Sequence, residues 1–384
     1  MSIAWVSHYR IKNFLSRQDR MAELILSKMP ADTRRYIDFL SQLPITQDWC
    51  TRNGSFYDPW RRQTPITPEL VIPELTSQNL KFAEICDLVA VKIVNRVNSD
   101  HRKLLIGYSG GVDSTALLVA LLKNNIDKQK VVLLISSDSI SENPVFYDNF
   151  IDNKLVCKDI KEFESEDHNY QNYYHSYGEF GDHLYIQSSP LKFHKSHSIP
   201  LTTKLTPYRD KIAEWMAPGD VDLRNWVNDQ MERITSPCPI PLDTTGSFLW
   251  WWAFNGKWHD VYFRRSSALD IYGLIRKQDP AMFTKFKSCE LDFYADPMFQ
   301  IWSMQNIASG EILKDGLDVY RRFSKEYIYD YNKDRDYFLY KGKVDSGSKI
   351  ASRLSEPLFI DGDLTTYYKK NTEQYSKLLY RLMY

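Results

Sequence analysis

The stretch from residue 103 to residue 136 constrains the fold of this chain more than any other part. It runs from a short apolar segment, KLLIGY, through a glycine turn, SGGVDS, into TALLVALLKNN and then into VVLLIS. Short apolar runs bounded by charge and glycine are typical of buried parallel strands. The run between them is apolar nearly all round, as in a buried helix. Strand, glycine turn, helix and strand in this order predict a βαβ unit with a parallel sheet.

The flanking segments extend this unit. Apolar residues at helical spacing predict a helix over residues 77–98, and LVCKDI, residues 155–160, is a candidate third strand. Beyond about residue 205 the chain is rich in Trp, Tyr and apolar residues at helical period. We therefore predict an α/β fold, a parallel sheet flanked by helices, with a largely helical C-terminal part. The expected division is an N-terminal extension over residues 1–76, an α/β core over 77–205 and a mainly helical part over 206–384.

Composition narrows the classes of partner and compartment. The 384 residues hold 49 Lys and Arg and 49 Asp and Glu, a balance that gives no overall attraction to nucleic acid or an anionic membrane but leaves room for a local basic face. The five cysteines form no CxxC pair and the eight histidines no HExxH pattern, so no zinc or redox site is indicated. The N-terminus lacks the apolar core of a signal peptide, and no apolar run approaches the ~20 residues of a membrane span. These features predict a cytoplasmic protein.

The glycine loop, SGGVDS, carries the sharpest chemical signal. Gly110 and Gly111 let backbone amides approach an anion closely, and the N-terminus of the following helix adds partial positive charge. The hydroxyls of Ser109 and Ser114 can donate hydrogen bonds to phosphate oxygens. Asp113 would repel bare phosphate, and its presence makes sense if Mg²⁺ lies between it and a polyphosphate. The loop has no GxxxxGK[ST] pattern and no lysine, so it is not a Walker A loop.

A second acidic motif, YGEFGDHLY, occupies residues 177–185. Glu179 and Asp182 are three residues apart with glycine between them, so their carboxylates can converge on one side of a turn. Such a pair can hold Mg²⁺ or orient a nucleophile near a phosphate-rich centre. Taken alone, the motif is more typical of an ordinary polar loop.

Together the two motifs resemble those of a known enzyme superfamily. The loop resembles the SGGxDS loop of the PP-loop ATP pyrophosphatases, the HUP-like adenine nucleotide α-hydrolases. The acidic motif is similar to the SGEGADELFGGY segment of asparagine synthetases and β-lactam synthetases. The resemblance spans roughly residues 77–340, with specificity confined to the two motifs. It implies ATP and Mg²⁺ as cofactors and an acyl adenylate as intermediate.

The resemblance also implies which residues bind the nucleotide and the metal. Asp113 and Asp182 would hold Mg²⁺, and Ser136, at the end of the second strand, would lie near the adenine. The phosphates of ATP would be bound by the residues of the glycine loop, Ser109, Gly110, Gly111, Asp113 and Ser114.

Catalytic roles follow from the same resemblance. Glu179 would orient or deprotonate the attacking amine, with Asp182 supporting the pyrophosphate end. Lys314 is the candidate for the family's pyrophosphate lysine, with an exposed helix-flanking lysine as the alternative interpretation.

The chain departs from the family in two places. Ser2 stands where glutamine-dependent asparagine synthetases have their nucleophilic cysteine, and only about 100 residues precede the loop, so ammonia from glutamine is not expected. His183 replaces the family's second Glu in the acidic motif, which argues against asparagine itself as the product. We therefore expect free ammonia, an amine, or ammonia from a separate partner as the nucleophile.

The predicted activity is that of an AMP- and pyrophosphate-forming ligase that joins a small-molecule carboxylate to ammonia or an amine. Two alternatives stay open. One is a PP-loop enzyme that modifies RNA or a nucleobase, of the lysidine type, although the neutral net charge argues mildly against tRNA. The other is a catalytically silent nucleotide-binding module.

Two further clusters are interpreted as structural. The tryptophans of LWWW, residues 249–252, are expected to pack in a helix rather than to stack on bases. Arg321 and Arg322 are expected on a solvated helix face, because acidic and aromatic residues interrupt the basic stretch.

Overall fold

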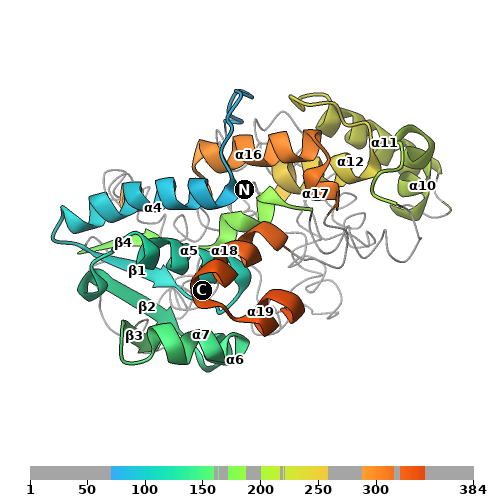
Figure 1. The fold of residues 1–384 in the computed structure, drawn as a ribbon. Helices are drawn as coiled ribbons and strands as arrows, with labels where there is room; N and C mark the ends of the chain where they lie inside the picture. The colour runs from blue at the N-terminus through green and yellow to red at the C-terminus, as the bar shows by residue number, and fades with distance from the viewer. Residues whose placement is uncertain are drawn as a thin grey trace, which may run out of the picture. The chain divides into compact units, whose positions relative to one another are not determined.

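The computed structural model describes residues 71–159, 163, 172–186, 200–216, 219, 221–257, 288–314 and 321–341. The chain forms two compact units. One comprises residues 73–185, 269–344 and 379–384, and the other comprises residues 1–72, 186–268 and 345–378. The first unit contains the sheet and is described first (Figure 1). The domain boundaries expected after residues 76 and 205 stay predictions.

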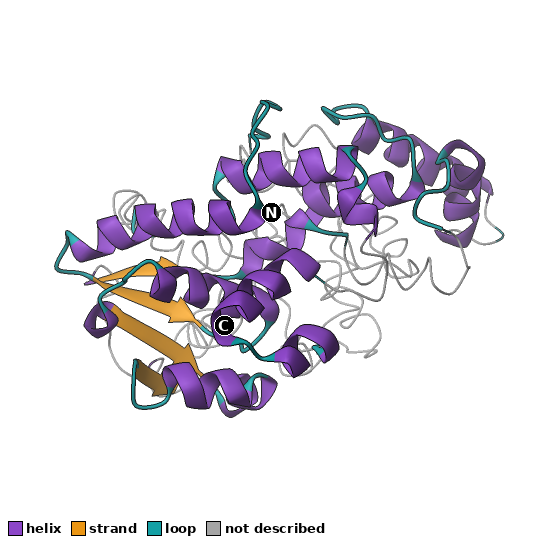
Figure 2. Ribbon diagram, in the orientation of Figure 1, coloured by secondary structure: helices purple, strands orange, loops and turns teal. Residues whose placement is uncertain are grey.

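A four-stranded parallel sheet forms the centre of this unit (Figure 2). Its strands are β1 (Lys103–Gly107), β2 (Val131–Ile135), β3 (Val156–Asp159) and β4 (Tyr173–Ser176), in the spatial order β3-β2-β1-β4. The βαβ unit, the third strand and the α/β class are confirmed. Strand β4 was not predicted, because its sequence YYHS lacks an apolar run.

Strands β1 and β2 are apolar because both of their faces are covered. On one face, a buried cluster joins Leu105, Val132 and Leu134 to Phe163, with Tyr173 packed against it. The opposite face is also buried, as Leu104 and its neighbours Ile106, Val131 and Leu133 show. Burial on both faces explains the near-continuous apolar runs, since a half-exposed strand would alternate polar and apolar residues.

Helices α4 (Phe82–Asn98), α5 (Val112–Lys123) and α18 (Arg322–Asn332) pack against one another. Asp87 of α4 ties them together by accepting hydrogen bonds from Lys123 (2.7 Å) and from the Tyr327 hydroxyl (2.6 Å). The predicted first helix starts at Phe82 rather than at residue 77. Lys81 is extended and its backbone N–H donates to the Glu84 carboxylate at 2.6 Å, which fixes the helix start there.

Further helices belong to the same unit. They are η1 (Lys128–Lys130), α6 (Ser137–Glu142), α7 (Pro144–Phe146), the π-helical η2 (Tyr147–Ile151), the 3₁₀-helical η4 (Glu179–Leu184), α16 (Pro297–Ala308), α17 (Glu311–Lys314) and α19 (Arg335–Tyr340). Helix α16 packs against α4 through aromatic contacts. The ring of Phe82 lies 5.0 Å from that of Trp302 and 5.5 Å from that of Phe299.

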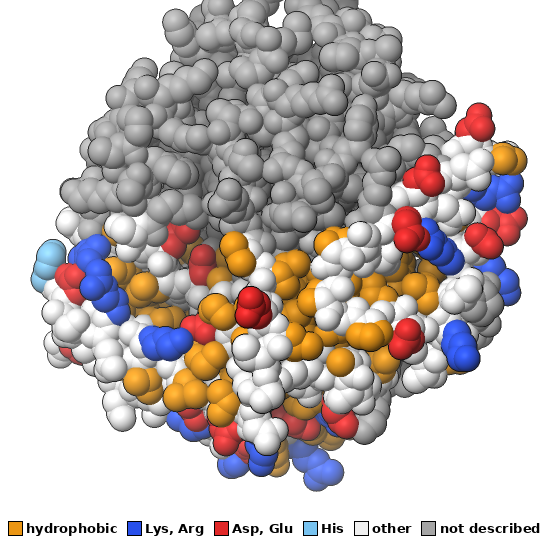
Figure 3. All heavy atoms as spheres, turned by 90° about the horizontal axis from the view of Figure 1, so that it is seen from above, with side chains coloured by type: hydrophobic (Ala, Val, Ile, Leu, Met, Phe, Trp, Pro, Cys, Tyr) orange, Lys and Arg blue, Asp and Glu red, His pale blue; other side chains and the backbone are white. Residues whose placement is uncertain are grey.

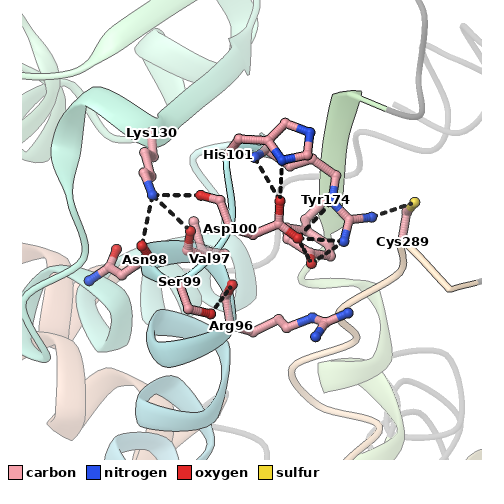
Figure 4. Close-up of polar contacts among 10 residues, drawn as sticks. Arg96, Val97, Asn98, Ser99, Asp100, His101, Lys130, Tyr174 and Cys289 are labelled. Atoms are coloured by element: carbon pink, nitrogen blue, oxygen red, sulfur yellow. Dashed lines mark hydrogen bonds and ion pairs between the residues drawn. The ribbon is translucent and has the colours of Figure 1, made fainter.

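The amino ends of the strands are held by a dense polar network (Figure 4). The Asp100 carboxylate accepts hydrogen bonds from Arg102 (2.6 Å) and from the Tyr174 hydroxyl of β4 (2.7 Å). Lys130 donates to three backbone carbonyl groups, those of Val97, Asn98 and Asp100, at 2.7–3.1 Å. The hydrogen bonds from Arg102 and then from Tyr174 hold the pKa of Asp100 well below its ordinary value. The network therefore joins α4 to the starts of β1, β2 and β4.

The described part of the second unit is helical. It contains α10 (Thr206–Met216), α11 (Val221–Thr235), α12 (Thr245–Trp252) and the π-helical η5 (Ala253–Lys257). Arg209 of α10 pairs with Glu232 of α11 at 2.6 Å. All three tryptophans of α12 are buried, which confirms that they serve helix packing.

Two observations bear on partners. Within the described ranges, no helix is both long enough and apolar enough to cross a membrane. On the face shown in Figure 3, the lysine and arginine side chains of the described residues are interspersed with acidic ones rather than gathered into a stripe.

Candidate functional site

The two sequence motifs meet at the carboxyl ends of β1 and β4. From β1 the chain moves to β2 and β3 on one side, and β4 then lies on the other side of β1. Ile106 of β1 pairs with Ser176 of β4 in the sheet register. The glycine loop follows β1 directly, and the acidic motif follows β4. In open parallel sheets, ligands bind outside the carboxyl ends of the strands where the strand order reverses, so both motifs lie where the topology favours a site.

Glycine is required at Gly110. Its φ is +74°, a conformation that costs other residues energy. A Cβ added there would also lie 2.3 Å from the backbone oxygen of Ser139 and 2.7 Å from the Cβ of Glu142. The loop is therefore pressed against α6, and this close fit holds its backbone at the start of α5.

The hydroxyl groups of the loop converge on the N-terminus of α5. Ser109 Oγ and Ser114 Oγ are 3.0 Å apart, and the Gly111 N–H donates to Ser109 Oγ at 3.3 Å. Ser114 Oγ also donates to the Gly111 carbonyl at 3.2 Å. The first amides of a helix have no partner within the helix and carry partial positive charge. Hydroxyl groups and amides thus gather at one point, as an anion site needs.

Two glycines of the acidic motif allow it to pack directly on the loop. A Cβ on Gly178 would lie 2.6 Å from the backbone nitrogen of Ser114. A Cβ on Gly181 would lie 2.7 Å from the Asp113 carboxyl group. No larger side chain fits at either position without a shift of the loop. The spacing of glycine and carboxylate in the motif is therefore explained by its contact with α5.

A buried arginine joins the two predicted metal-binding carboxylates. Arg321 contacts Asp113 through Nη1 and Asp182 through Nη2. The Arg321 side chain is only 4% exposed, against 16% and 23% for the two aspartates. Burial lowers the pKa of the Arg321 guanidinium to about 9, so the group stays charged at neutral pH.

The prediction that Arg321 lies on a solvated helix face was wrong. Arg321 directly precedes α18, with a φ of +56°, and its side chain turns into the protein. Two carboxylates from distant parts of the sequence compensate for the loss of water around the Arg321 charge. The residues near Arg321 in the sequence do not reveal these distant partners. Arg322, with 31% of its side chain exposed, is closer to the expectation.

Two lysines add positive charge beside the loop. Lys341 pairs with Glu142, the residue whose side chain lies against Gly110. Lys325, four residues after Arg321 on α18, is 2% exposed. No hydrogen-bond or ion-pair partner of its ammonium group is found among the described residues. Burial, and then the nearby charge of Lys341, lowers the pKa of Lys325 to about 8.

Other predicted site residues differ in how they are placed. Glu179 is exposed at the start of η4, while Gly178 and Phe180 beside it are buried or nearly so, which turns its carboxylate outward. The Ser136 hydroxyl accepts a hydrogen bond from the Ser139 N–H at 3.2 Å and caps α6 at the end of β2. Lys314 ends α17, and its side chain lies outside the part of the chain that the structure describes. The roles of these residues stay predictions.

The donors expected for Mg²⁺ are two carboxylates. Within the described residues, no group of three or more His, Cys, Asp or Glu forms a ready metal cage. Asp113 and Asp182 nevertheless converge, since one guanidinium contacts both. Mg²⁺ in nucleotide sites typically uses one or two carboxylates and takes its remaining ligands from phosphate and water. The donor set therefore fits Mg²⁺ bound together with a polyphosphate.

Comparisons with protein-family models, with curated proteins and with solved structures found no match.

Sequence reasoning did not single out Arg321, Lys325 and Lys341 as site residues. A signal for the first two was present, because Arg321, Lys325 and the apolar Ile328 follow one another at helical spacing and so share one face of a helix. Ile328 is fully buried, and the face therefore points inward. A basic pair on the buried face of a helix predicts an anionic partner, and Asp113 and Asp182 are that partner for Arg321.

Proposed function

We propose that this protein is an ATP-dependent ligase with a PP-loop, HUP-like core, which adenylates a small-molecule carboxylate and transfers the acyl group to ammonia or an amine. One observation carries the proposal. The glycine loop and the acidic motif, far apart in sequence, lie against each other at the carboxyl ends of β1 and β4. Their aspartates converge on a single charged group.

The first step needs charge neutralisation on the leaving group. A carboxylate oxygen of the substrate attacks the α-phosphorus, the bond between that phosphorus and the bridging oxygen to the β-phosphorus breaks, and pyrophosphate leaves. The loop amides and the Ser109 and Ser114 hydroxyls would hold the β- and γ-phosphates at the N-terminus of α5. Lys325, which lies near Lys341, would add positive charge that departing pyrophosphate requires, whereas the charge of Lys341 is balanced by Glu142.

Mg²⁺ held by Asp113 and Asp182 would supply further neutralisation of the phosphate charge. The largely buried surroundings of these aspartates strengthen such interactions, because water screens them less.

The second step forms the new carbon–nitrogen bond. The amine nitrogen attacks the acyl carbon, AMP leaves with the electron pair of the broken carbon–oxygen bond, and the nitrogen loses a proton. Glu179 is the candidate to orient the amine or accept that proton, because it is exposed at the start of the acidic motif. An anionic carboxylate at this position also favours a cationic amine in the encounter complex.

The test is the release of pyrophosphate and AMP from Mg²⁺–ATP by the purified full chain, screened over carboxylic acids with ammonium and simple amines. Substrate-dependent formation of both products, lost in Asp113→Asn, is the expected result. Asp148→Asn serves as the matched control, because Asp148 is exposed and lies outside the site. Release of ADP and orthophosphate instead would rule the proposal out.

The same experiment separates the two alternative functions. Tight ATP binding without consumption under any condition would favour the silent nucleotide-binding module. Consumption of ATP to AMP only when RNA is added, together with a gel shift on tRNA, would favour the RNA-modifying enzyme.

A further inference from the structure

Arg321 and a metal ion need the same oxygen atoms. The guanidinium contacts Oδ2 of Asp113 and Oδ1 of Asp182. The other oxygen of Asp113, Oδ1, is buried without a hydrogen-bond partner among the described residues. It is also one of the atoms that a Cβ on Gly181 would approach to 2.7 Å. Asp113 therefore offers only Oδ2 to a ligand, and Arg321 already contacts that atom.

We propose that Arg321 is a resident counter-ion of the metal site, which leaves the two aspartates when a metal–nucleotide complex binds and then contacts its phosphates. The proposal rests on the proposed function for the identity of the nucleotide. Its metal-dependent part concerns only Arg321, Asp113 and Asp182.

The charges of the site favour such an exchange. Two buried carboxylates without a cation would repel each other, and one guanidinium leaves the trio with a net charge of −1. A divalent ion on the same oxygens satisfies both aspartates and removes the need for the arginine there. A guanidinium cannot lose its proton to escape this competition, so it must move. The incoming phosphates are the anions that can then accept it.

The backbone of Arg321 has an energetically unfavourable conformation. Its φ of +56° is uncommon for a residue other than glycine and is tolerated only where surrounding contacts compensate. The two ion pairs are contacts that hold Arg321 in this conformation. Loss of both pairs to a metal ion would remove that compensation and favour a change in the backbone just before α18.

A second basic residue, Lys325, supports the proposed movement of Arg321 from the aspartates to the phosphates. Lys325 lies one helical turn beyond Arg321, is 2% exposed, and has no ion-pair or hydrogen-bond partner for its ammonium group among the described residues. The side chain of Lys325 is largely buried, and its ammonium group can therefore take a ligand anion as its partner. Lys325 and the displaced Arg321 would then both contact phosphate, from the same helix.

The experiment measures metal binding without nucleotide. Mn²⁺, a spectroscopic substitute for Mg²⁺, is titrated into the parent chain, Arg321→Met and the control Arg322→Met, and bound Mn²⁺ is followed by electron paramagnetic resonance. Arg321→Met is expected to bind Mn²⁺ about tenfold or more tightly than the parent, because a competing cation is gone. Its melting temperature without metal should fall, and Mn²⁺ should raise it more than it raises that of the parent.

In Arg321→Met the melting temperature without metal should fall while the Mn²⁺ affinity rises. These opposite changes distinguish the proposed role from a merely structural one. A folded Arg321→Met chain whose Mn²⁺ affinity equals that of the parent would overturn the proposal. Tighter binding that persists in Arg321→Met/Asp182→Asn would overturn it as well, because the gain would then come from another site. If Arg321→Met does not fold, Arg321→Lys replaces it. This variant keeps the charge but loses the two-pronged contact, so a smaller gain in Mn²⁺ affinity is expected.

The phosphate-dependent part is tested by calorimetry with a non-hydrolysable ATP analogue at saturating Mg²⁺. Arg321→Met should bind the analogue more weakly than Arg322→Met, although it binds the metal more tightly. Equal affinity for the analogue would overturn the transfer of Arg321 to phosphate. Absence of pyrophosphate release from the parent chain would count against the proposed function alone, since the Mn²⁺ measurement involves no reaction.

Discussion

The two ends of the sheet differ in how completely their polar groups are paired. At the amino end, Asp100, Arg102 and Tyr174 bond to one another, and Lys130 donates to three carbonyl groups (Figure 4). At the carboxyl end, Asp113 keeps a buried oxygen without a partner, and the ammonium group of Lys325 has none among the described residues. Paired groups fix the strands in place, whereas the ammonium group of Lys325 keeps its capacity to bind an anion.

The two ends of the sheet also differ in their use of glycine. Gly110, Gly178 and Gly181 all lie at the carboxyl end, and each sits so close to neighbouring atoms that a Cβ would meet them within 3 Å. These positions bring backbone and carboxylate together at the cost of greater flexibility in the unfolded chain. The amino end instead uses long side chains to join its elements. We therefore expect substitutions at the two ends to separate activity from stability.

The largest expected effect is loss of activity at the carboxyl end. Asp113→Asn and Asp182→Asn should each lower kcat/KM for pyrophosphate release by roughly 10²–10³-fold, because each removes a charge that the metal–phosphate complex needs. Steady-state kinetics on the two variants and the parent, with Asp148→Asn as control, checks this. Near-parental rates for both variants would break the assignment of the site.

The next effect comes from Gly110. Gly110→Ala should abolish measurable ATP binding and lower stability by more than the ~1 kcal/mol that a positive φ alone costs alanine, because its Cβ would also clash with Ser139. Gly310→Ala is the matched control, since Gly310 has a φ of +78° and nothing within 4 Å of the added Cβ. Chemical denaturation measures the loss of stability in each variant, and calorimetry measures its ATP binding. Equal losses in both variants would mean that the tight packing of the loop is unimportant.

A smaller effect concerns the pH dependence of ATP binding. The pKa of Lys325 is lowered to about 8, so the side chain is charged below that pH and neutral above it. Phosphate favours the charged form, and ATP affinity should therefore weaken by about three- to tenfold between pH 7.5 and 9. Calorimetry over this range should show a flat profile for Lys325→Met and a parental slope for the exposed control Lys128→Met. A slope retained in Lys325→Met would assign the titration to another group.

The smallest effect is expected at the amino end. Asp100→Asn should lower the melting temperature by a few degrees and leave ATP affinity unchanged. Because the folded-state pKa of Asp100 is lowered, its contribution to stability is present above the ordinary carboxylate value of about 4 and is lost as pH falls below it. The difference in melting temperature between the parent and Asp100→Asn should therefore shrink from pH 7 to pH 3.5. A change in ATP affinity at pH 7 would show that the two ends are not independent.

Sequence patterns predicted the local parts of this molecule well. The segments that form β1, α5 and β2 are short continuous apolar stretches, and burial at the centre of the sheet requires that composition. The loop was also predictable, because its glycines act on neighbouring backbone. The pairing of strands β1 and β4 was not predicted, since the four residues of β4 include His175 and Ser176 and resemble a loop.

The charged centre of the site could be predicted only in part. Asp113 and Asp182 stood out through their motifs, and the structure brings them together. Arg321 did not stand out, because its burial depends on two carboxylates more than a hundred residues away along the chain. The fit of Gly181 against Asp113 is equally non-local. The helical spacing of Arg321, Lys325 and Ile328 indicates an inward face, but it does not identify Asp113 and Asp182 as the partners, which is why the arginine was misplaced while the aspartates were not.

The strand order has a consequence for the newly synthesised chain. Leu104 of the central strand pairs with Val131 soon after it is made, but its other neighbour, Tyr174, follows only much later, and Arg321 later still. Loop closure favours the near pairing first, so a growing chain can form the glycine loop and half of the sheet long before the acidic motif arrives. The contacts of Asp113 and Asp182 with Arg321 would therefore form late in synthesis, after residue 321 has been added to the chain.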